Sequence, residues 1–168
     1  MYEEAVAVPL IVAGPDIPSV RAVDTPTNLV DVYPFIFECV GARDDETVPH
    51  DLSATSIAAL ADGADSARVT FSEYHGMGSK EAAFMVRKGP WKFVYYTQYP
   101  AQLFNLVEDP EELTDLAARQ EHATVIADLT DELMKICDPS AVDAAARADQ
   151  ARAIEENGGK EPIIKRGE

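Results

Sequence analysis

The chain has 168 residues, 46% of them hydrophobic, and this composition predicts a globular protein rather than a disordered one. Its formal net charge of −16 argues against a nucleic-acid partner, because the phosphates would be repelled. The sequence shows no apolar run long enough to span a membrane and no signal-peptide pattern.

The most informative feature is an unbroken apolar run near the N-terminus. Leu10, Ile11, Val12 and Ala13 follow one another and end at Gly14. A strand with one wet face alternates polar and apolar residues, whereas an unbroken run is typical of a parallel strand covered on both faces. Since no second run of this kind occurs, we predict that the strand belongs to the sheet of a larger protein, of which this chain is the tail.

A helix is predicted over residues 25–41. Thr25 suits its N-cap, Pro26 its first turn and Gly41 its C-terminal stop. Pro34 should kink this helix or mark its real start. One apolar stripe is formed by Leu29, Tyr33, Ile36, Phe37 and Val40. The segment from there to residue 66 is predicted to be mostly loop.

From residue 68 onward the apolar period changes to two, which indicates strands. Strands are predicted over 69–75, 82–87 and 91–96, and the last two are joined by a Lys88-Gly89-Pro90 turn. A fourth short strand is predicted over 102–106. Together these segments predict a small antiparallel sheet.

Two helices are predicted after the sheet. Asp109 and Pro110, followed by two glutamates, indicate the start of the first helix. Its apolar face would consist of Val125, Ile126, Leu129, Leu133 and Ile136. The second helix is Ala-rich, spans 139–157 and should stop at Gly158-Gly159. Cys39 and Cys137 are predicted to be two buried thiols rather than a disulfide.

A resemblance to a known family runs over nearly the whole chain: residues 2–6 and 8–12 are similar to the family's strand entry and residues 28–41 to the helix that follows it. Three further segments carry it in the predicted sheet and its exit. They are Phe71-Ser-Glu-Tyr74, Met85-Val-Arg-Lys-Gly-Pro-Trp-Lys-Phe93 and, most specifically, Gln102-Leu-Phe-Asn-Leu-Val-Glu-Asp-Pro-Glu-Glu-Leu113. In this order they resemble the C-terminal third of the type I sulfatases, members of the alkaline-phosphatase-like superfamily. The closing stretch, residues 148–159, is similar to choline-sulfatase-like bacterial members.

The resemblance implies chemistry for which this chain lacks the residues. Type I sulfatases hydrolyse sulfate esters with a formylglycine, made from the cysteine of a Cys-x-Pro-x-Arg signature, and with a divalent metal, calcium. Neither Cys39, followed by Val-Gly, nor Cys137, followed by Asp-Pro-Ser, matches that signature. The family's metal-binding Asp-His-Gly segment and sulfate-binding lysine lie just upstream of a segment like Tyr2-Glu3-Glu4. We therefore expect no cofactor in this chain, and calcium and formylglycine in a missing N-terminal catalytic domain.

The resemblance also implies that the C-terminal domain helps to line the substrate pocket. His75 ends a predicted strand and leads into the glycine-rich segment 76–79. We expect His75, with Glu73 or Tyr74, to reach towards the organic group of a small sulfate-ester substrate. The alternative is a strand-end histidine bonded to solvent or backbone, and Glu73 is either a buried, paired carboxylate or a strand-end group in water. No catalytic residue and no metal ligand is expected here.

Other charged and aromatic residues are expected to have structural roles. Arg87, Lys88 and Lys92 flank the predicted turn and should be solvated rather than steer an anionic ester. The nine acidic residues from Glu108 to Glu132 should form a wet helical surface. The alternating aromatic residues Trp91, Phe93 and Tyr95 should pack in the core rather than form a stacking platform.

The predicted fold class is α+β: a small four-stranded antiparallel sheet packed with helices, plus one strand and one helix of the large α/β domain of an alkaline-phosphatase-like fold. Residues 1–66 would end that α/β domain, 67–138 would form the sheet and its packing helix, and 139–168 the last helix and tail. The chain alone is expected to be inactive. The alternatives are a non-catalytic interaction module whose exposed strand recruits a partner or a second copy, and the tail of a phosphonate or phosphate monoester hydrolase of the same superfamily. Homo-oligomerisation stays open, as does the compartment, bacterial cytoplasm or periplasm.

Overall fold

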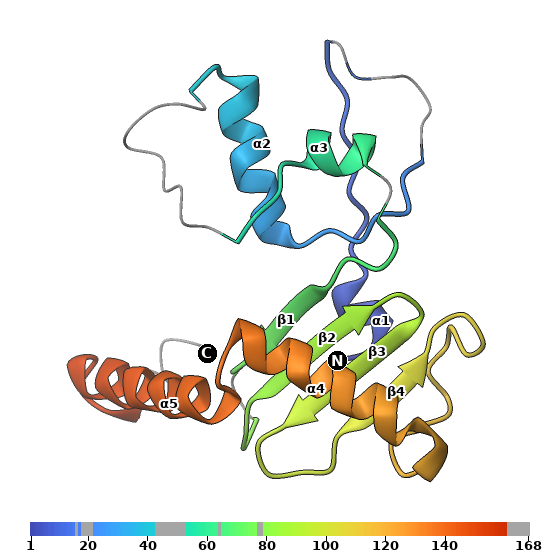
Figure 1. The fold of residues 1–168 in the computed structure, drawn as a ribbon. Coiled ribbons are helices and arrows are strands. Elements are labelled where there is room, and N and C mark those ends of the chain that lie inside the picture. The colour runs from blue at the N-terminus through green and yellow to red at the C-terminus, as the bar shows by residue number, and fades with distance from the viewer. Residues whose placement is uncertain (16, 18–21, 43–52, 64, 77–78, 161–168) are drawn as a thin grey trace.

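The computed structural model describes residues 1–15, 17, 22–42, 53–63, 65–76 and 79–160. Figure 1 shows a four-stranded sheet with helices on both faces and, beside it, a smaller N-terminal lobe, defined here as the described residues between 7 and 63. The predicted loop residues 43–52 and tail residues 161–168 lie outside the described part. None of the helices in the described part is both long and apolar enough to cross a bilayer.

The predicted antiparallel sheet is confirmed. Its strands are β1 (Thr70–Tyr74), β2 (Ala83–Lys88), β3 (Trp91–Tyr96) and β4 (Gln102–Asn105), and they lie side by side in chain order. All three pairings are antiparallel. A two-residue turn joins β2 to β3, and Gly89 occupies the left-handed region there with φ 57°, a conformation that glycine adopts without steric cost.

The two faces of the sheet are covered by different parts of the chain. Helix α4 (Ala123–Ile136) packs on one face, over a core that contains Phe84, Val86, Phe93, Leu103, Leu129 and Leu133. Each such fully buried side chain stabilises the fold by about 1.5–3 kcal/mol. On the other face Val6 of the short helix α1 (Glu3–Val6) and Met1 pack against Ala83, Met85 and Val94. Trp91, Phe93 and Tyr95 all belong to the α4-side core, which confirms their packing role.

The helix predicted after the sheet begins at Ala123 and not at Asp109, so its predicted start is wrong, whereas most of its predicted apolar face is confirmed on α4. The Asp109 carboxylate accepts hydrogen bonds from the backbone N–H groups of Leu113 (3.1 Å) and Thr114 (2.8 Å), so it closes a turn instead of a helix. Glu112 has φ 54°, which an α-helix excludes. The chain then runs along the outer edge of β4, where Leu116 N–H donates to Leu103 O (2.8 Å). A 3₁₀ turn, Gln120–His122, leads into α4.

The helix predicted over 25–41 is shorter than expected. It begins with a 3₁₀ turn, Leu29–Asp31, and continues as α2 (Val32–Cys39) with Pro34 as its third residue, so the proline does mark the real start. The second helix of the N-terminal lobe is α3 (Ile57–Asp62).

The predicted strand at the N-terminus is wrong for this chain. Residues 10–13 lie outside every helix and strand, and Figure 1 shows this segment leaving α1 and running away from the sheet. Leu10 is 47% exposed and Ile11 is 88% exposed. The described part of the chain has no parallel strand beside this segment, so its backbone has no ladder to join and its side chains have nothing to bury them.

The last helix follows its prediction closely. It is α5 (Pro139–Glu156), capped by the Asp138 carboxylate, which accepts hydrogen bonds from the N–H groups of Ser140 and Ala141. Beyond its end Gly158 and Gly159 adopt φ 81° and 100°, the left-handed values of a helix stop.

The two cysteines are free thiols, as expected. The prediction that both are buried is half wrong, because Cys39 is exposed at the end of α2 whereas Cys137 is partly buried against the α4-side core. Among the described elements α2 packs on α3 and on the 3₁₀ turn that precedes it, and these contacts leave Cys39 exposed.

Candidate functional site

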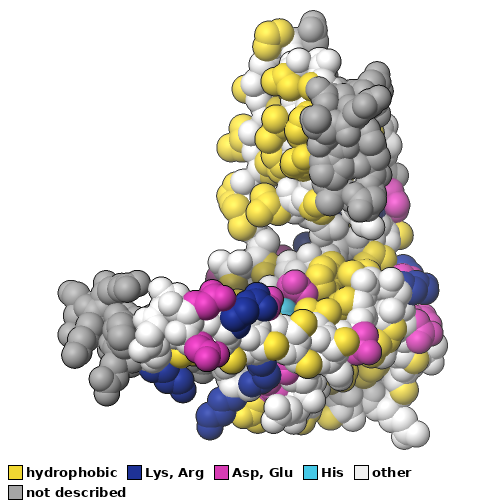
Figure 2. Space-filling view, turned by 90° about the vertical axis from the view of Figure 1, so that its left-hand side faces the viewer, with side chains coloured by type: hydrophobic (Ala, Val, Ile, Leu, Met, Phe, Trp, Pro, Cys, Tyr) yellow, Lys and Arg dark blue, Asp and Glu magenta, His cyan; other side chains and the backbone are white. Residues whose placement is uncertain are grey.

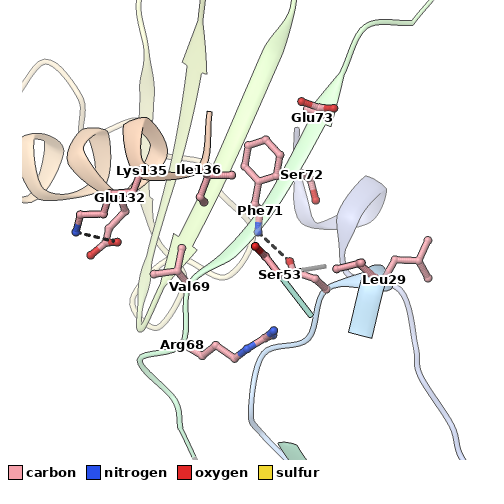
Figure 3. A pocket seen from close by; sticks show the side chains of 12 residues that line it. Leu29, Ser53, Arg68, Val69, Phe71, Ser72, Glu73, Glu132, Lys135 and Ile136 are labelled. Carbon is pink, nitrogen blue, oxygen red and sulfur yellow. Dashed lines mark hydrogen bonds and ion pairs between the residues drawn. The ribbon is translucent and has the colours of Figure 1, made fainter. Parts of the chain in front are cut away.

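A cleft of about 680 Å³ lies between the N-terminal lobe and the sheet. Leu29 and Ser53 line it from the lobe, and Val69, Phe71 and Ile136 line it from the entry to β1, from β1 and from α4 (Figure 3). The polar residues that line it are Asn28, Ser53, Arg68, Ser72, Glu73, Glu132 and Lys135. It combines apolar walls with a few charged groups, as ligand sites do.

A fully buried carboxylate, Asp31, holds the two walls of this cleft together. It accepts hydrogen bonds from the N–H groups of Asn28 (2.7 Å) and Thr55 (2.9 Å) and pairs with Arg68 Nη2 (2.9 Å). Asn28 in turn accepts, through Oδ1, the N–H of Phe71 on β1 (2.9 Å). The lobe is thus attached to β1 by ionic and backbone contacts, which set the width of the cleft.

The charges on the α4 wall neutralise one another. Lys88 Nζ lies 2.6 Å from Glu132 Oε1, and Lys135 Nζ lies 3.3 Å from Glu132 Oε2. The hydrogen bond from Lys88, followed by that from Lys135, lowers the pKa of the Glu132 carboxyl, while the same Glu132 contact raises the pKa of Lys88. The two charges that line the cleft from α4, Glu132 and Lys135, thus cancel, and Lys88 of β2 adds one positive charge to the group.

Two of the three predicted substrate-binding residues lie together. Glu73 lines the cleft and points from the α4-side face of the sheet, with 42% of its side chain exposed. His75 Nε2 lies 3.6 Å from Glu73 Oε2, and the imidazole packs edge-on against Phe84 with ring centroids 5.5 Å apart. Of the two alternatives for Glu73, the strand-end group in water is the one observed.

Tyr74 lies on the opposite face of the sheet from Glu73 and His75, because successive strand residues point to opposite faces. It pairs with Ala83, whose side chain belongs to the core on the α1 side. Its ring lies over Gly76, where an added Cβ would come within 2.2 Å of Tyr74 Cζ. The structure therefore does not bring Tyr74 to the cleft.

Lys92 and Glu112 correct two expectations. Lys92 is buried rather than solvated: its Nζ lies 2.8 Å from Glu112 Oε1 and 3.0 Å from Glu3 Oε1. Glu112 is likewise buried instead of lying on a wet helical surface, and its Oε2 accepts the N–H of Glu3 (2.6 Å). This buried ionic cluster, Lys92–Glu112–Glu3, attaches α1 to the sheet.

The described residues do not fit a calcium site. Within the described ranges no three or more His, Cys, Asp or Glu side chains are grouped closely enough to hold a metal ion. Two of the buried carboxylates, Asp31 and Glu112, are already paired with Arg68 and Lys92. No catalytic step through a metal can be assigned to these residues.

Most of the residues that line the cleft were missed by the sequence analysis. Glu132 and Lys135 on α4 come to lie beside Arg68 and Ser72 only because α4 packs back across the sheet. Neither a motif nor a spacing joins residues more than 60 positions apart. The one available signal was the apolar face of α4, which does predict that this helix covers the sheet.

Comparisons with known proteins agree on one class. The chain is 34% identical to arylsulfatase K of Mus musculus over 129 residues, which cover 70% of this chain and 23% of that protein. It is 35% identical to the choline-sulfatase of Rhizobium meliloti (strain 1021) over 155 residues, which cover 90% of this chain and 30% of that protein. The chain thus spans less than a third of the length of these relatives.

Solved structures show the same fold at lower identity. A putative sulfatase from Bacteroides thetaiotaomicron VPI-5482 aligns with a TM-score of 0.51 and 21% identity, covering 61% of this chain and 22% of its own. BT4656, solved with its substrate D-glucosamine-2-N,6-O-disulfate, aligns with a TM-score of 0.53 and 17% identity, covering 64% of this chain and 23% of its own.

The fold and these likenesses define the C-terminal region of a sulfatase. More specifically, residues 1–138 match the family described as N-sulphoglucosamine sulphohydrolase, C-terminal, and the chain belongs to that family. The resemblance read from segments of residues 71–113 is thereby confirmed.

Proposed function

We propose that this chain acts as the C-terminal part of an enzyme that hydrolyses a small sulfate ester, supporting the catalytic part and forming one wall of the substrate pocket. The observation that carries the proposal is the exposed apolar segment that follows α1. Val8, Leu10 and Ile11 are 78%, 47% and 88% exposed, and they are close together in the sequence. A soluble protein rarely leaves such a segment uncovered.

The apolar surface continues over the N-terminal lobe. Figure 2 shows hydrophobic side chains gathered on the part of the molecule that carries α2 and α3. Leu29, Val30, Ile36 and Val40 are all exposed, from 39% to 89%. The occupant that we propose is the remainder of the sulfatase, since the matched relatives are more than three times longer than the segment they share with this chain.

The pocket wall that we propose is the end of β1. Glu73 lines the cleft, and the His75 imidazole lies beside it with both ring nitrogens shielded from solvent in this chain, so a carboxylate backed by an imidazole stands at one position. Such a pair can accept and donate hydrogen bonds to the organic group of an ester without taking part in S–O cleavage. A sulfate ester, rather than a phosphate or phosphonate ester, is favoured by the family that the chain matches.

The groups that would cleave the ester belong to the catalytic part in this proposal. A formylglycine supplies the nucleophile and calcium offsets charge on the sulfate oxygens. This chain's own contribution is to hold the wall residues in place and to exclude water from the pocket.

Two assays test the proposal. The purified chain should not hydrolyse an aryl sulfate in the presence of calcium. Turnover above a blank would contradict the proposal that the cleaving groups belong to the catalytic part. In the complete sulfatase, His75→Ala should raise KM about fivefold to tenfold, the loss of about one hydrogen bond, with a smaller change in kcat. Tyr74→Phe serves as the control because Tyr74 faces away from the cleft; an unchanged KM for His75→Ala would remove His75 from the pocket wall.

A further inference from the structure

The helix α5 touches the connection between β1 and β2 at two points. Gln150 Nε2 donates a hydrogen bond to the carbonyl oxygen of His75 (2.8 Å), at the end of β1. Arg147 Nη2 donates to the carbonyl oxygen of Lys80 (2.5 Å), just before β2. Both donors lie on one side of α5, because residues three positions apart face the same way on a helix.

The position of α5 is itself fixed at its first turn. Pro139 is buried, and Val142 packs against the α4-side core. The Asp143 carboxylate then holds Arg147 through its Nε (3.0 Å), which orients the guanidinium towards Lys80. The remainder of the helix is largely exposed, so its contacts with the β1–β2 connection are polar and specific rather than a by-product of apolar packing.

The imidazole of His75 has few direct restraints of its own. Neither ring nitrogen has a hydrogen-bond partner among the described residues, although both are shielded from solvent. The ring is placed by its contact with Phe84 and by the backbone that carries it. A hydrogen bond to the His75 carbonyl therefore acts directly on where the ring lies.

We propose that α5 is a positioning element for His75, with Gln150 and Arg147 as the positioning residues. The two side chains hold the backbone on either side of the β1–β2 connection, and this keeps the imidazole against Phe84 and beside Glu73. The match to the sulfatase C-terminal family ends at residue 138, before α5, whereas the likeness to the choline-sulfatase covers 90% of the chain and so extends into this helix. A different helix at this place would present His75 differently, which makes α5 a determinant of the pocket wall; this last step rests on the proposed function.

The test compares the intact chain with an Arg147→Ala/Gln150→Ala double variant. Hydrogen exchange of the peptide that covers residues 74–83 should become about threefold to tenfold faster, the effect of losing one or two exposed hydrogen bonds. The His75 Cε1–H signal in NMR, shifted by the ring current of Phe84, should move towards the position of a free histidine. An Arg147→Lys variant, which keeps a cationic donor at this position, should exchange more slowly over residues 74–83 than the double variant does.

Arg152→Ala is the matched control, because the described ion pairs of Arg152 are with Asp149 and Glu156 of the same helix. It should leave the exchange and the His75 signal as they are in the intact chain. Unchanged exchange and an unchanged His75 signal in the double variant, with α5 still helical by circular dichroism, would overturn the proposal. Because no activity is measured, this result is independent of the kinetic test of His75.

Discussion

Lys92 and Glu112 form an ion pair of 2.8 Å between side chains of which at most 1% is open to solvent. The sequence places them 20 residues apart, on β3 and in the turn that follows β4. Glu3 completes the cluster from α1, at 3.0 Å from the same ammonium group. Three segments of the chain therefore meet on one buried positive charge, and that charge links the N-terminal end of the chain to the sheet.

Removing Lys92 should strongly destabilise the protein. In Lys92→Ala the buried Glu112 carboxylate loses its counter-ion, and Glu3 keeps only Arg87, whose Nη1 lies 3.5 Å from Glu3 Oε2. Breaking a buried pair in this way costs about 3–5 kcal/mol. The free energy of unfolding in urea measures the loss. Lys88→Ala is the comparison, because the Lys88–Glu132 pair lies at the surface, and it should cost much less than Lys92→Ala. Equal losses of unfolding free energy in the two variants would mean that the buried ion pairs of Lys92 contribute no more to stability than a surface pair does.

Stability should depend on pH through Glu132. Its pKa is lowered by the hydrogen bonds from Lys88 and Lys135, so its contribution is present above the usual range of a glutamate, about pH 4.3, and is lost as the pH falls through the lowered pKa. The urea midpoint of Glu132→Gln should therefore lie below that of the intact chain at pH 7, and the difference should shrink towards pH 3. If the difference in urea midpoint stays constant from pH 7 to pH 3, the charge of the Glu132 carboxylate does not contribute to the stability.

The two cysteines should differ in reactivity. Burial raises the pKa of the Cys137 thiol, and the negative charges of Glu73 and Asp138 add to this, so little thiolate forms near neutral pH. Cys39 is exposed and should react with iodoacetamide at least about tenfold faster, as followed by mass spectrometry of the intact chain. Cys39→Ser should remove the fast phase and leave the slow one; a fast phase that survives this substitution would contradict the assignment.

An acidic residue at position 11 should matter only when the catalytic part is present. Ile11 is 88% exposed here, so Ile11→Asp should change the stability of the chain alone by less than about 0.5 kcal/mol. In the complete sulfatase the same substitution should lower the melting temperature, because it places a charge in the proposed contact. Val107→Asp is the control: Val107 is 78% exposed and follows β4, the edge strand opposite β1. Equal effects of the two substitutions on the complete enzyme would argue against that contact.

The sheet could be predicted from the sequence because the patterns that indicate its strands and turn lie within short segments of the chain. The period of two in residues 69–75 and the Gly89-Pro90 turn each depend on neighbouring residues, and β2 and β3 lie within one residue of their expected bounds. The same holds for α5, with its Asp138 cap and glycine stop. Patterns of this kind describe a backbone that needs no distant partner in order to form.

Features that depend on distant partners were missed or misjudged. Asp109 and Pro110 have the residue types of a helix start, but backbone N–H groups captured by the Asp109 carboxylate close a turn instead. Lys92 has the pattern of a surface lysine until Glu112 and Glu3 are brought over it. The cleft is likewise a product of packing, since its walls come from the N-terminal lobe, β1 and α4. The spacing of residues along the chain therefore does not predict that these three parts lie together.

Because the four strands follow one another across the sheet in chain order, every strand pairs only with its neighbours in the sequence. The loops that must close to form it are short, and short loops lose little chain entropy on closure. The sheet should thus be able to form early, on a timescale set by hairpin zipping, before the N-terminal lobe has found its place. A freshly made polypeptide would then carry a finished C-terminal platform onto which the slower, longer-range parts of the enzyme can dock.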